Sequence, residues 1–307
     1  MVQKNCINKK AIIICGATAS GKTALAVECA KLLNSEVISA DSMYIYKGLS
    51  IGTAKPTKDE MKGIVHHLID LADPTDSFSV SDYKLLATPI LDRLFEENKV
   101  PIICGGTGFY INSLLFDLSY GNSKANIDAR VKYNNLAKEK GNIAVYNVLI
   151  EKDPQTASKL HFNDLKRVIR ALEIIESGYK KSEINDSLTP KFSYNAYSIS
   201  HPREVLYNRI NSRVENMIKA GLINEIQSLI DSGVNKNCQC FQGIGYKEVL
   251  EYLDGTLSLD ETVEKIKLNT RHYAKRQITF FKRMDNLTML EPQAVELLAQ
   301  RIVGELW

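Results

Sequence analysis

The sequence predicts an α/β fold, in which a parallel sheet with flanking helices is interrupted by an inserted all-helical subdomain. Three observations predict it: short apolar strands alternate with helices early in the chain, a helical pattern with scattered Lys and Arg occupies residues 118–189, and a strand-like segment returns at residues 193–200. Alternation of this kind is typical of a buried sheet with helical crossovers. We therefore expect a core of residues 1–117 and 190–307 and an inserted domain over residues 118–189.

The core elements are predicted from local pattern. Short, largely apolar runs bounded by glycine or polar residues predict strands at residues 11–15, 36–39 and 100–104, and residues 193–200 (SYNAYSIS) resemble a returning strand. Helical spacing of apolar residues predicts a helix over residues 23–33 and another over residues 206–218, the latter closing at Gly221.

Composition excludes several classes of protein. With 307 residues, 44% of them hydrophobic and 24% charged, the chain is typical of a globular protein, and its net charge of +3 is compatible with an RNA partner. The apolar stretch after the basic first ten residues is too short for a signal peptide or a membrane span, so we expect a cytoplasmic protein with no membrane partner. Cys238 and Cys240 have no second Cys/His pair nearby, which argues against a zinc site.

The motif G-x-x-x-x-G-K-[ST] stands between the first strand and the first helix. It comprises Gly16, Ala17, Thr18, Ala19, Ser20, Gly21, Lys22 and Thr23. In such a P-loop the backbone N–H groups surround phosphate oxygens, the lysine reaches the phosphates and the hydroxyl of Thr23 is placed to ligate Mg²⁺. The sequence therefore predicts a P-loop NTPase-like core, with Mg²⁺ as its cofactor.

The motif does not say what happens to the phosphates. Many NTPases have a metal-supporting Asp at the end of a second strand, but the strand at residues 100–104 ends in Gly-Gly-Thr. The acid that follows a strand nearby is Asp41, whose residue type and position suit a helix cap, a metal-side ligand or a general base.

Ordered motifs over residues 11–283 resemble the tRNA dimethylallyltransferases, also called tRNA isopentenyl transferases. They are GATASGKT (16–23), ADSMYIYKGLSIGTAKP (40–56), HHLID (66–70), GGTGFY (105–110), RVIRALE (167–173), NRINSRVENMIKAGLINEI (208–226), GIGYKE (243–248) and TRHYAKRQITFF (270–281). The eukaryotic members' Cys-X-X-His zinc finger is absent, so the chain resembles the bacterial type. Tyr44 stands where the family usually has Gln, Phe280 where it usually has Trp, and Ser50 where Asp is common.

The resemblance implies transfer of a dimethylallyl group from dimethylallyl diphosphate to N6 of adenine 37 in tRNAs that read codons beginning with U. The products are N6-dimethylallyladenosine and diphosphate, and a monomer is expected. Because the leaving diphosphate gains negative charge, a P-loop with Lys22, Thr23 and Mg²⁺ suits this chemistry, and the chain has no D-D-x-x-D cluster that would hold metals instead. The resemblance favours Asp41 as the general base, and the Thr107 hydroxyl is expected to donate to the diphosphate or to the substrate backbone.

An adenine stacked in the anticodon loop must be extruded before it can react, so basic and aromatic residues are expected around the pocket. Arg271, Lys275 and Lys282 fall on one face of a predicted helix, whereas His66 and His67 are expected to be structural. The inserted domain is expected to contact the tRNA anticodon stem-loop. The candidate tRNA-binding residues are Asp41, Ser42, Met43, Tyr44, Thr107, Arg130, Lys166, Arg167, Val168, Ile169, Arg170, Gln242, Gly243, Ile244, Gly245, Tyr246, Lys247, Arg271, Lys275 and Arg276.

Two other functions remain open from the residues alone. One is a small-molecule enzyme: either a P-loop nucleotide kinase in which Arg167 and Arg170 clamp phosphates, or a prenyltransferase that acts on free AMP. The other is a P-loop RNA-binding module without catalysis, for which Asp41 and Thr107 would be dispensable.

Overall fold

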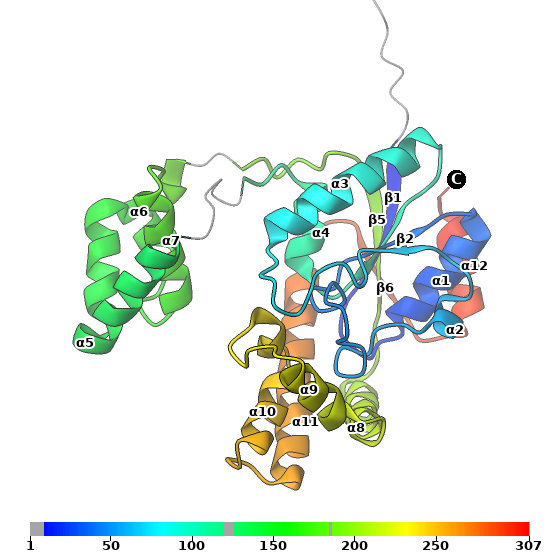
Figure 1. Ribbon diagram of the computed structural model, residues 1–307. Coiled ribbons are helices and arrows are strands. Elements are labelled where there is room, and N and C mark those ends of the chain that lie inside the picture. The colour runs from blue at the N-terminus through cyan, green and yellow to red at the C-terminus, as the bar shows by residue number, and fades with distance from the viewer. Residues whose placement is uncertain (1–8, 120–125, 184–185, 307) are drawn as a thin grey trace, which may run out of the picture. The chain divides into compact units, whose positions relative to one another are not determined.

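The computed structural model describes residues 9–119, 126–183 and 186–306. These residues form two compact units (Figure 1). The larger unit contains the described residues up to Leu115 and from Lys191 onward, and the smaller one runs from Phe116 to Pro190.

The larger unit is built on a parallel sheet. Its strands are β1 (Lys10–Cys15), β2 (Val37–Ser39), β3 (His66–His67), β4 (Ile102–Gly105), β5 (Ser193–Ile199) and β6 (Leu287–Leu290). They lie in the order β3-β2-β4-β1-β5-β6, and every neighbouring pair is parallel. The predicted parallel α/β sheet is thus confirmed. The two edge strands, β3 and β6, were not predicted, because each is short and β3 consists of two histidines.

Helices cover both faces of the sheet (Figure 1). Helices α1 (Lys22–Leu33) and α12 (Val295–Gly304) pack together on one face, and α3 (Val80–Glu96) and α4 (Gly108–Leu115) cover the other. Ile12 and Ile14 of β1 are fully buried and share a core with Leu25 of α1 and Leu298 of α12. This burial of an entirely apolar strand explains why β1 reads as a continuous hydrophobic run. The short helix α2 (Lys58–Met61) follows β2 in the chain.

Four further helices form a group below the sheet in Figure 1. They are α8 (Arg203–Lys219), α9 (Leu222–Asp231), α10 (Tyr246–Leu253) and α11 (Leu259–Phe281). Helix α8 ends two residues before Gly221, whose φ of +97° is a left-handed conformation that glycine adopts readily. Leu206 and Ile210 of α8 and Ala274 of α11 form a small apolar cluster with Ala17, so these helices support the P-loop directly.

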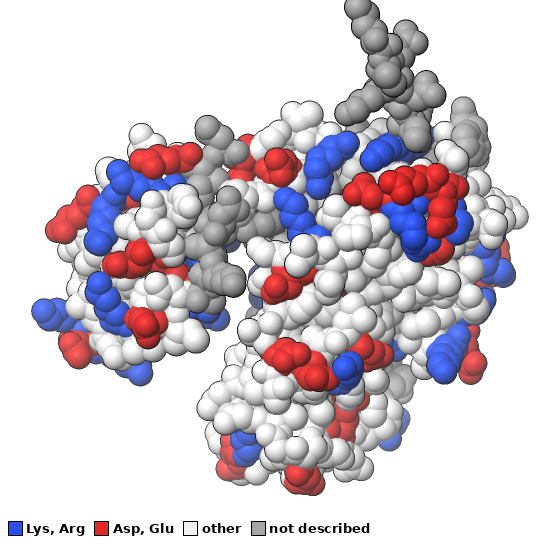
Figure 2. Space-filling model, turned by 45° about the horizontal axis from the view of Figure 1, so that its top comes forward, with Lys and Arg blue, Asp and Glu red and all other residues white. Residues whose placement is uncertain are grey.

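In its described residues the smaller unit contains the helices α5 (Ile127–Lys152), α6 (Pro154–Ala157) and α7 (Leu165–Glu176) and a 3₁₀ turn at Lys181–Glu183. Gly141, with φ of +81°, interrupts α5. The core of this unit includes Tyr133, Val145, Leu149 and Leu172. On the face shown in Figure 2, basic and acidic side chains of this unit are interspersed, without a surface of a single sign.

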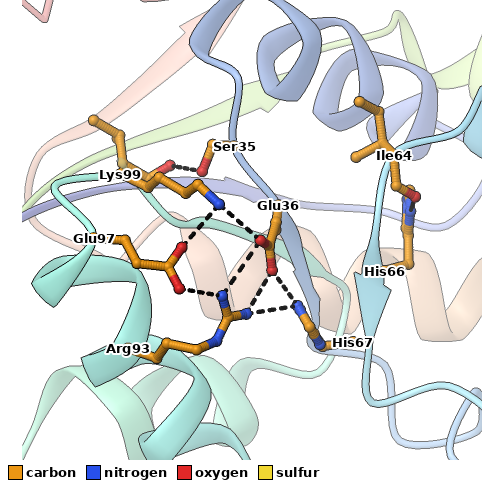
Figure 3. A network of polar contacts seen from close by, with 9 residues as sticks. Ser35, Glu36, Ile64, His66, His67, Arg93, Glu97 and Lys99 are labelled. Atoms are coloured by element: carbon orange, nitrogen blue, oxygen red, sulfur yellow. Dashed lines mark hydrogen bonds and ion pairs between the residues drawn. The ribbon is translucent and has the colours of Figure 1, made fainter.

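A polar network ties β2 and β3 to α3 (Figure 3). Glu36 Oε2 accepts from Arg93 Nη2 at 2.6 Å and contacts His67 Nε2 at 2.6 Å, and Glu36 Oε1 accepts from Lys99 Nζ at 3.0 Å. His66 turns away from this cluster and bonds through Nδ1 to the carbonyl of Ile64 at 2.9 Å. Both histidines therefore hold the edge of the sheet, as expected from the sequence.

Candidate active site

The P-loop connects β1 to α1, and its lysine, Lys22, is hydrogen-bonded to the loop backbone. Gly16 and Gly21 adopt φ of +122° and +98°, and a Cβ on Gly16 would lie 2.2 Å from Ser198 Oγ, so only glycine fits there. Lys22 Nζ donates to the carbonyl of Ala17 at 2.6 Å. The buried hydroxyl of Ser20 has no hydrogen-bond partner among the described residues, although Ser20 lines the cavity described below. That hydroxyl and the loop N–H groups suit a phosphate ligand.

Two side chains from the segment after β5 fix the outer side of the loop. His201 Nε2 donates to the carbonyl of Ser20 at 2.9 Å, and Arg209 Nε of α8 donates to the carbonyl of Ala19 at 2.7 Å. These two donors satisfy carbonyl oxygens that would otherwise repel an anion bound in the loop. Neither residue was assigned a role from the sequence. His201 lies outside every recognised motif, and Arg209 lies in the motif at residues 208–226 but was not distinguished from its neighbours.

The carboxyl ends of β2 and β4 meet beside the P-loop. The backbone N–H of Thr107 donates to the carbonyl of Ala40 at 3.0 Å, and the N–H of Ser42 donates to Thr107 Oγ1 at 3.0 Å. A Cβ on Gly105 would lie 2.1 Å from the carbonyl oxygen of Ala40. The close approach of these two strand ends, which only a glycine permits, places Asp41 next to the Gly-Gly-Thr-Gly turn of residues 105–108.

Asp41 and Lys22 form an electrostatically coupled pair. Desolvation raises the pKa of Asp41 above its ordinary value, although the N–H of Met43, which donates to Oδ1 at 3.0 Å, and the charges of Lys22 and Arg213 act in the opposite direction. Desolvation lowers the pKa of Lys22. A carboxylate with a raised pKa is a better proton acceptor near neutral pH than an ordinary surface carboxylate.

One cavity of about 1180 Å³ collects these groups, and all of its lining residues belong to the larger unit. Its walls come from the P-loop, from residues 41–44, from α8, from residues 242–244 and from α11. Lys247, Arg213 and Arg276 bring positive charge to it, and Tyr273 brings an aromatic ring. This arrangement combines a phosphate cradle, a carboxylate and a basic, aromatic wall in one space.

The carboxylate of Glu225 holds the turn at residues 50–52 in place. The carboxylate of Glu225 in α9 accepts from the backbone N–H groups of Ser50, Ile51 and Gly52 at 2.8, 2.7 and 3.2 Å and from the hydroxyl of Tyr246 at 2.7 Å. The turn that it holds continues into Thr53, which also lines the cavity. Glu225 thereby sets the position of one cavity wall.

Two cavity side chains depend on that wall. Arg213 Nη2 donates to the carbonyl of Thr53 at 2.9 Å, and the hydroxyl of Tyr44 donates to the carbonyl of Ala54 at 2.9 Å. Desolvation raises the pKa of Tyr44. Its hydroxyl therefore remains protonated and bound to the protein's own backbone.

Gln277 and Tyr273 of α11 reach the opposite side of the P-loop. Gln277 Oε1 accepts from the N–H of Thr18 at 2.8 Å, and Gln277 Nε2 donates to the carbonyl of Gly106 at 3.0 Å. Desolvation raises the pKa of Tyr273 to about 12, although the side chains of Thr107 and Gln277 act in the opposite direction. The sequence places both residues in a recognised motif without distinguishing them from their neighbours; their role depends on which face of α11 is buried.

The structure brings many predicted residues into the cavity. The predicted residues that line it are Thr18, Ala19, Ser20, Gly21, Lys22, Thr23, Asp41, Ser42, Met43, Tyr44, Gln242, Gly243, Ile244, Lys247 and Arg276. Thr107 is not among the lining residues but contacts Ser42 and Tyr273, which are. Arg213, Glu225 and Gln277 were missed, although all three lie in recognised motifs.

Some predicted tRNA contacts are corrected by burial. Val168 and Ile169 are 0% and 6% exposed and pack in the core of the smaller unit, so their side chains are structural. Tyr246 is 1% exposed and bonded to Glu225, and the N–H of Gly245 bonds to Glu248. These four residues are buried, although they lie in recognised motifs.

Several predicted cations already have protein partners. Arg130 and Arg170 both contact the fully buried carboxylate of Glu173, at 3.2 and 3.0 Å. Arg271 Nη1 donates to Asn211 Oδ1 of α8 at 3.0 Å. Lys275 and Lys282, which were predicted to share a helix face with Arg271, are exposed. Lys166, Arg167 and Lys275 have exposed side chains.

The oxygen donors of the cavity fit Mg²⁺. No group of three or more His, Cys, Asp or Glu residues suited to a metal occurs within residues 9–119, 126–183 and 186–306. Mg²⁺, however, keeps several waters and takes few protein oxygens together with substrate phosphates. The Thr23 hydroxyl and the Asp41 carboxylate line the same cavity as the P-loop and supply such oxygens. In the described part of the chain, no helix has the length and apolarity needed to cross a membrane.

Comparisons with known proteins show the family of the chain. The chain is 46% identical over 284 residues to a tRNA dimethylallyltransferase of Alkaliphilus oremlandii, covering 92% of this chain and 91% of the relative. A crystal structure of the full-length tRNA isopentenylpyrophosphate transferase of Bacillus halodurans matches with a TM-score of 0.73 and 40% identity, covering 97% of both chains. A structure of a eukaryotic dimethylallyltransferase acting on tRNA matches with a TM-score of 0.81 and 30% identity, covering 96% of this chain and 78% of that one. Residues 44–284 match the family model described as IPP transferase, and the chain belongs to that family.

Proposed function

We propose that this enzyme transfers a dimethylallyl group from dimethylallyl diphosphate to N6 of adenine 37 in tRNAs that read codons beginning with U. The carrying observation is the shared cavity of the P-loop and Asp41. The names of the relatives and structural neighbours support the reaction class and the tRNA acceptor. The position of the adenine and the codon rule come from the resemblance, and we propose action as a cytoplasmic monomer on the same basis.

The proposed step breaks the C1–O bond of the donor and forms a bond between C1 and N6 of the adenine. The diphosphate leaves with the bonding electron pair and is held by the P-loop N–H groups and Lys22. The proton lost from N6 passes to the carboxylate of Asp41, whose raised pKa supports this assignment. Thr107 is assigned to the donor's bridging oxygen. Its hydroxyl donates to Ser42 Oγ at 3.3 Å in the structure and must rotate to donate to the substrate instead.

When bound, Mg²⁺ would be held by the Thr23 hydroxyl, with the Asp41 carboxylate nearby, and would supply charge neutralisation to the diphosphate. Lys22 contributes a fixed positive charge to the same end. Its bond to the carbonyl of Ala17 keeps it pointed along the loop before the donor arrives.

Two features support a macromolecular acceptor. The cavity volume of about 1180 Å³ exceeds what a drug-sized ligand usually fills. Lys247 and Arg276 on its walls suit backbone phosphates, and Tyr273 and Met43 offer surfaces for an extruded base. In the smaller unit we assign Lys166 and Arg167, both exposed, to the RNA backbone.

The small-molecule alternatives have weaker support. A nucleotide kinase of the P-loop type needs an acid near the end of the strand beside β1, where β4 continues into Gly105, Gly106 and Thr107. Prenyl transfer to free AMP would use the same donor site, so only the acceptor distinguishes it.

The test is to incubate the purified protein with radiolabelled dimethylallyl diphosphate, Mg²⁺ and either unmodified bacterial tRNA or free AMP. Label is expected in tRNA alone, at one adenine of the anticodon loop when the RNA is digested. An adenine 37→guanine tRNA is the matched control and should remain unlabelled. Label in AMP, or consumption of ATP without label transfer, would assign the chain to a small-molecule class instead.

A further inference from the structure

The buried amide of Gln277 bridges the two loops that border the donor site. Gln277 is 5% exposed, and both ends of its side chain are engaged. Its oxygen accepts from the N–H of Thr18 in the P-loop, and its nitrogen donates to the carbonyl of Gly106 in the Gly-Gly-Thr-Gly turn. The side chain of Gln277 in α11 thus links the loops that follow β1 and β4.

The geometry permits this bridge only with the residues present. A Cβ on Gly106 would lie 2.1 Å from Gln277 Nε2, so a side chain at position 106 would displace the amide. A carboxylate at position 277 would present an oxygen to the carbonyl of Gly106, and a shorter side chain would not span both partners. The amide provides one acceptor and one donor in the orientation that the two loops require.

Helix α11 has one buried face and one exposed face. Tyr273, one turn before Gln277, lies near the side chains of Thr107 and Gln277, whereas Lys275 and Arg276 are exposed. The buried face therefore contacts the phosphate loops, and the exposed face is available to an acceptor.

We propose that Gln277 is a positioning residue for the donor diphosphate, which acts by holding the P-loop against the Gly-Gly-Thr-Gly turn. This inference rests on the proposed function for the identity of the ligand. Gln277 does not touch the reacting atoms. It sets the separation of the two loops, and with it the direction of the P-loop N–H groups on which diphosphate affinity depends.

The direct measurement is the Kd of inorganic pyrophosphate with Mg²⁺, by calorimetric titration of the full chain. Gln277→Met keeps the size of the side chain but loses both hydrogen bonds, and we expect its Kd to rise about tenfold, or about 1.4 kcal/mol. The KM for dimethylallyl diphosphate should rise with it, while the Kd for tRNA and the KM for tRNA stay near the native values. Thr262→Val is the control, because Thr262 is also buried in α11 but bonds only within that helix.

A double-mutant cycle separates positioning from general loosening. Gly106→Ala should displace the Gln277 amide and weaken pyrophosphate binding to a similar extent. In a Gln277→Ala background the displaced group is absent, so Gly106→Ala should add little. This cycle also serves if the Met variant does not fold.

The outcomes are distinct. Unchanged pyrophosphate affinity in folded Gln277→Met, additive effects in the cycle, or equal losses of pyrophosphate and tRNA affinity would each overturn the positioning role. If the native protein bound no pyrophosphate and transferred no prenyl group, the proposed function itself would fail.

Discussion

The clamp around Glu225 makes a quantitative prediction. Replacing Glu225 with Ala leaves three backbone N–H groups and the Tyr246 hydroxyl without their acceptor. Ser50 is exposed and can bond to water, and the bond from Gly52 is the longest at 3.2 Å, so we count two shielded bonds, those from Ile51 and Tyr246. At about 1.5 kcal/mol for a hydrogen bond to a charged acceptor, the loss is about 3 kcal/mol.

The assay is thermal unfolding followed by circular dichroism. For a unit of this size, about 3 kcal/mol corresponds to a decrease in Tm of about 6–12 °C. Tyr246→Phe removes one of the two counted bonds and should lower Tm by about half as much. Glu264→Ala is the matched control, since Glu264 forms only an exposed ion pair with Lys267, and should change Tm little.

Activity provides a second reading of the same change. Because the clamped turn continues to Thr53 and Ala54, which bind Arg213 and Tyr44, Glu225→Ala should lower kcat/KM even at temperatures where the variant is fully folded. A Tm decrease no larger than that of Glu264→Ala, together with native kcat/KM, would refute the reasoning that this carboxylate positions the cavity wall.

Three other predictions follow from the geometry. Asp41→Asn should lower kcat by about 10²–10⁴-fold. Because the pKa of Asp41 is raised, we expect the acid limb of the native kcat/KM profile above the ordinary carboxyl range, and this limb should be absent from the profile of the variant. Gly105→Ala should destabilise the larger unit by at least about 1–3 kcal/mol in urea unfolding, because its Cβ would meet the backbone carbonyl of Ala40 at 2.1 Å; a native urea midpoint would contradict the close approach of β2 and β4. Hydrogen bonds from Arg93 hold the pKa of Glu36 at about 2, below its ordinary 4.5, so the stability that Glu36 contributes is complete above pH 4.5 and is lost as the pH falls toward 2; Glu36→Gln should reduce stability at pH 7 more than at pH 2.5.

Local pattern was sufficient for the central elements of the fold. Strands β1, β2 and β4 are buried, and each appears in the sequence as a short, largely apolar run, whereas β5 (SYNAYSI) has a mixed pattern. Helices α1 and α8 carry the helical spacing of one buried face. The edge strands did not show this signal. β3 is half-buried His66-His67, and its conformation depends on pairing with β2 and on Glu36, which is distant in the sequence from His67.

The site shows the same division. The P-loop is a local structure whose glycines, lysine and hydroxyl have a required spacing, so the sequence predicts it completely. Membership of a motif did not predict which side chains are exposed: Val168, Ile169 and Tyr246 lie in motifs, but their side chains are buried. A motif names a segment, and only the packing of a helix decides which of its side chains face solvent.

The sequence by itself predicted the parallel α/β core and the P-loop at Gly16–Thr23, because each depends on neighbouring residues and a short spacing, and its resemblance to a known family singled out Asp41 as the candidate base. Only the tertiary structure decided which distant groups meet there. Gln277 reaches Thr18 across 259 positions, and Glu225 reaches Ser50 across 175. Contacts of this range arise from how α9 and α11 pack against the loops at the carboxyl ends of the strands, and no periodicity in the chain records them.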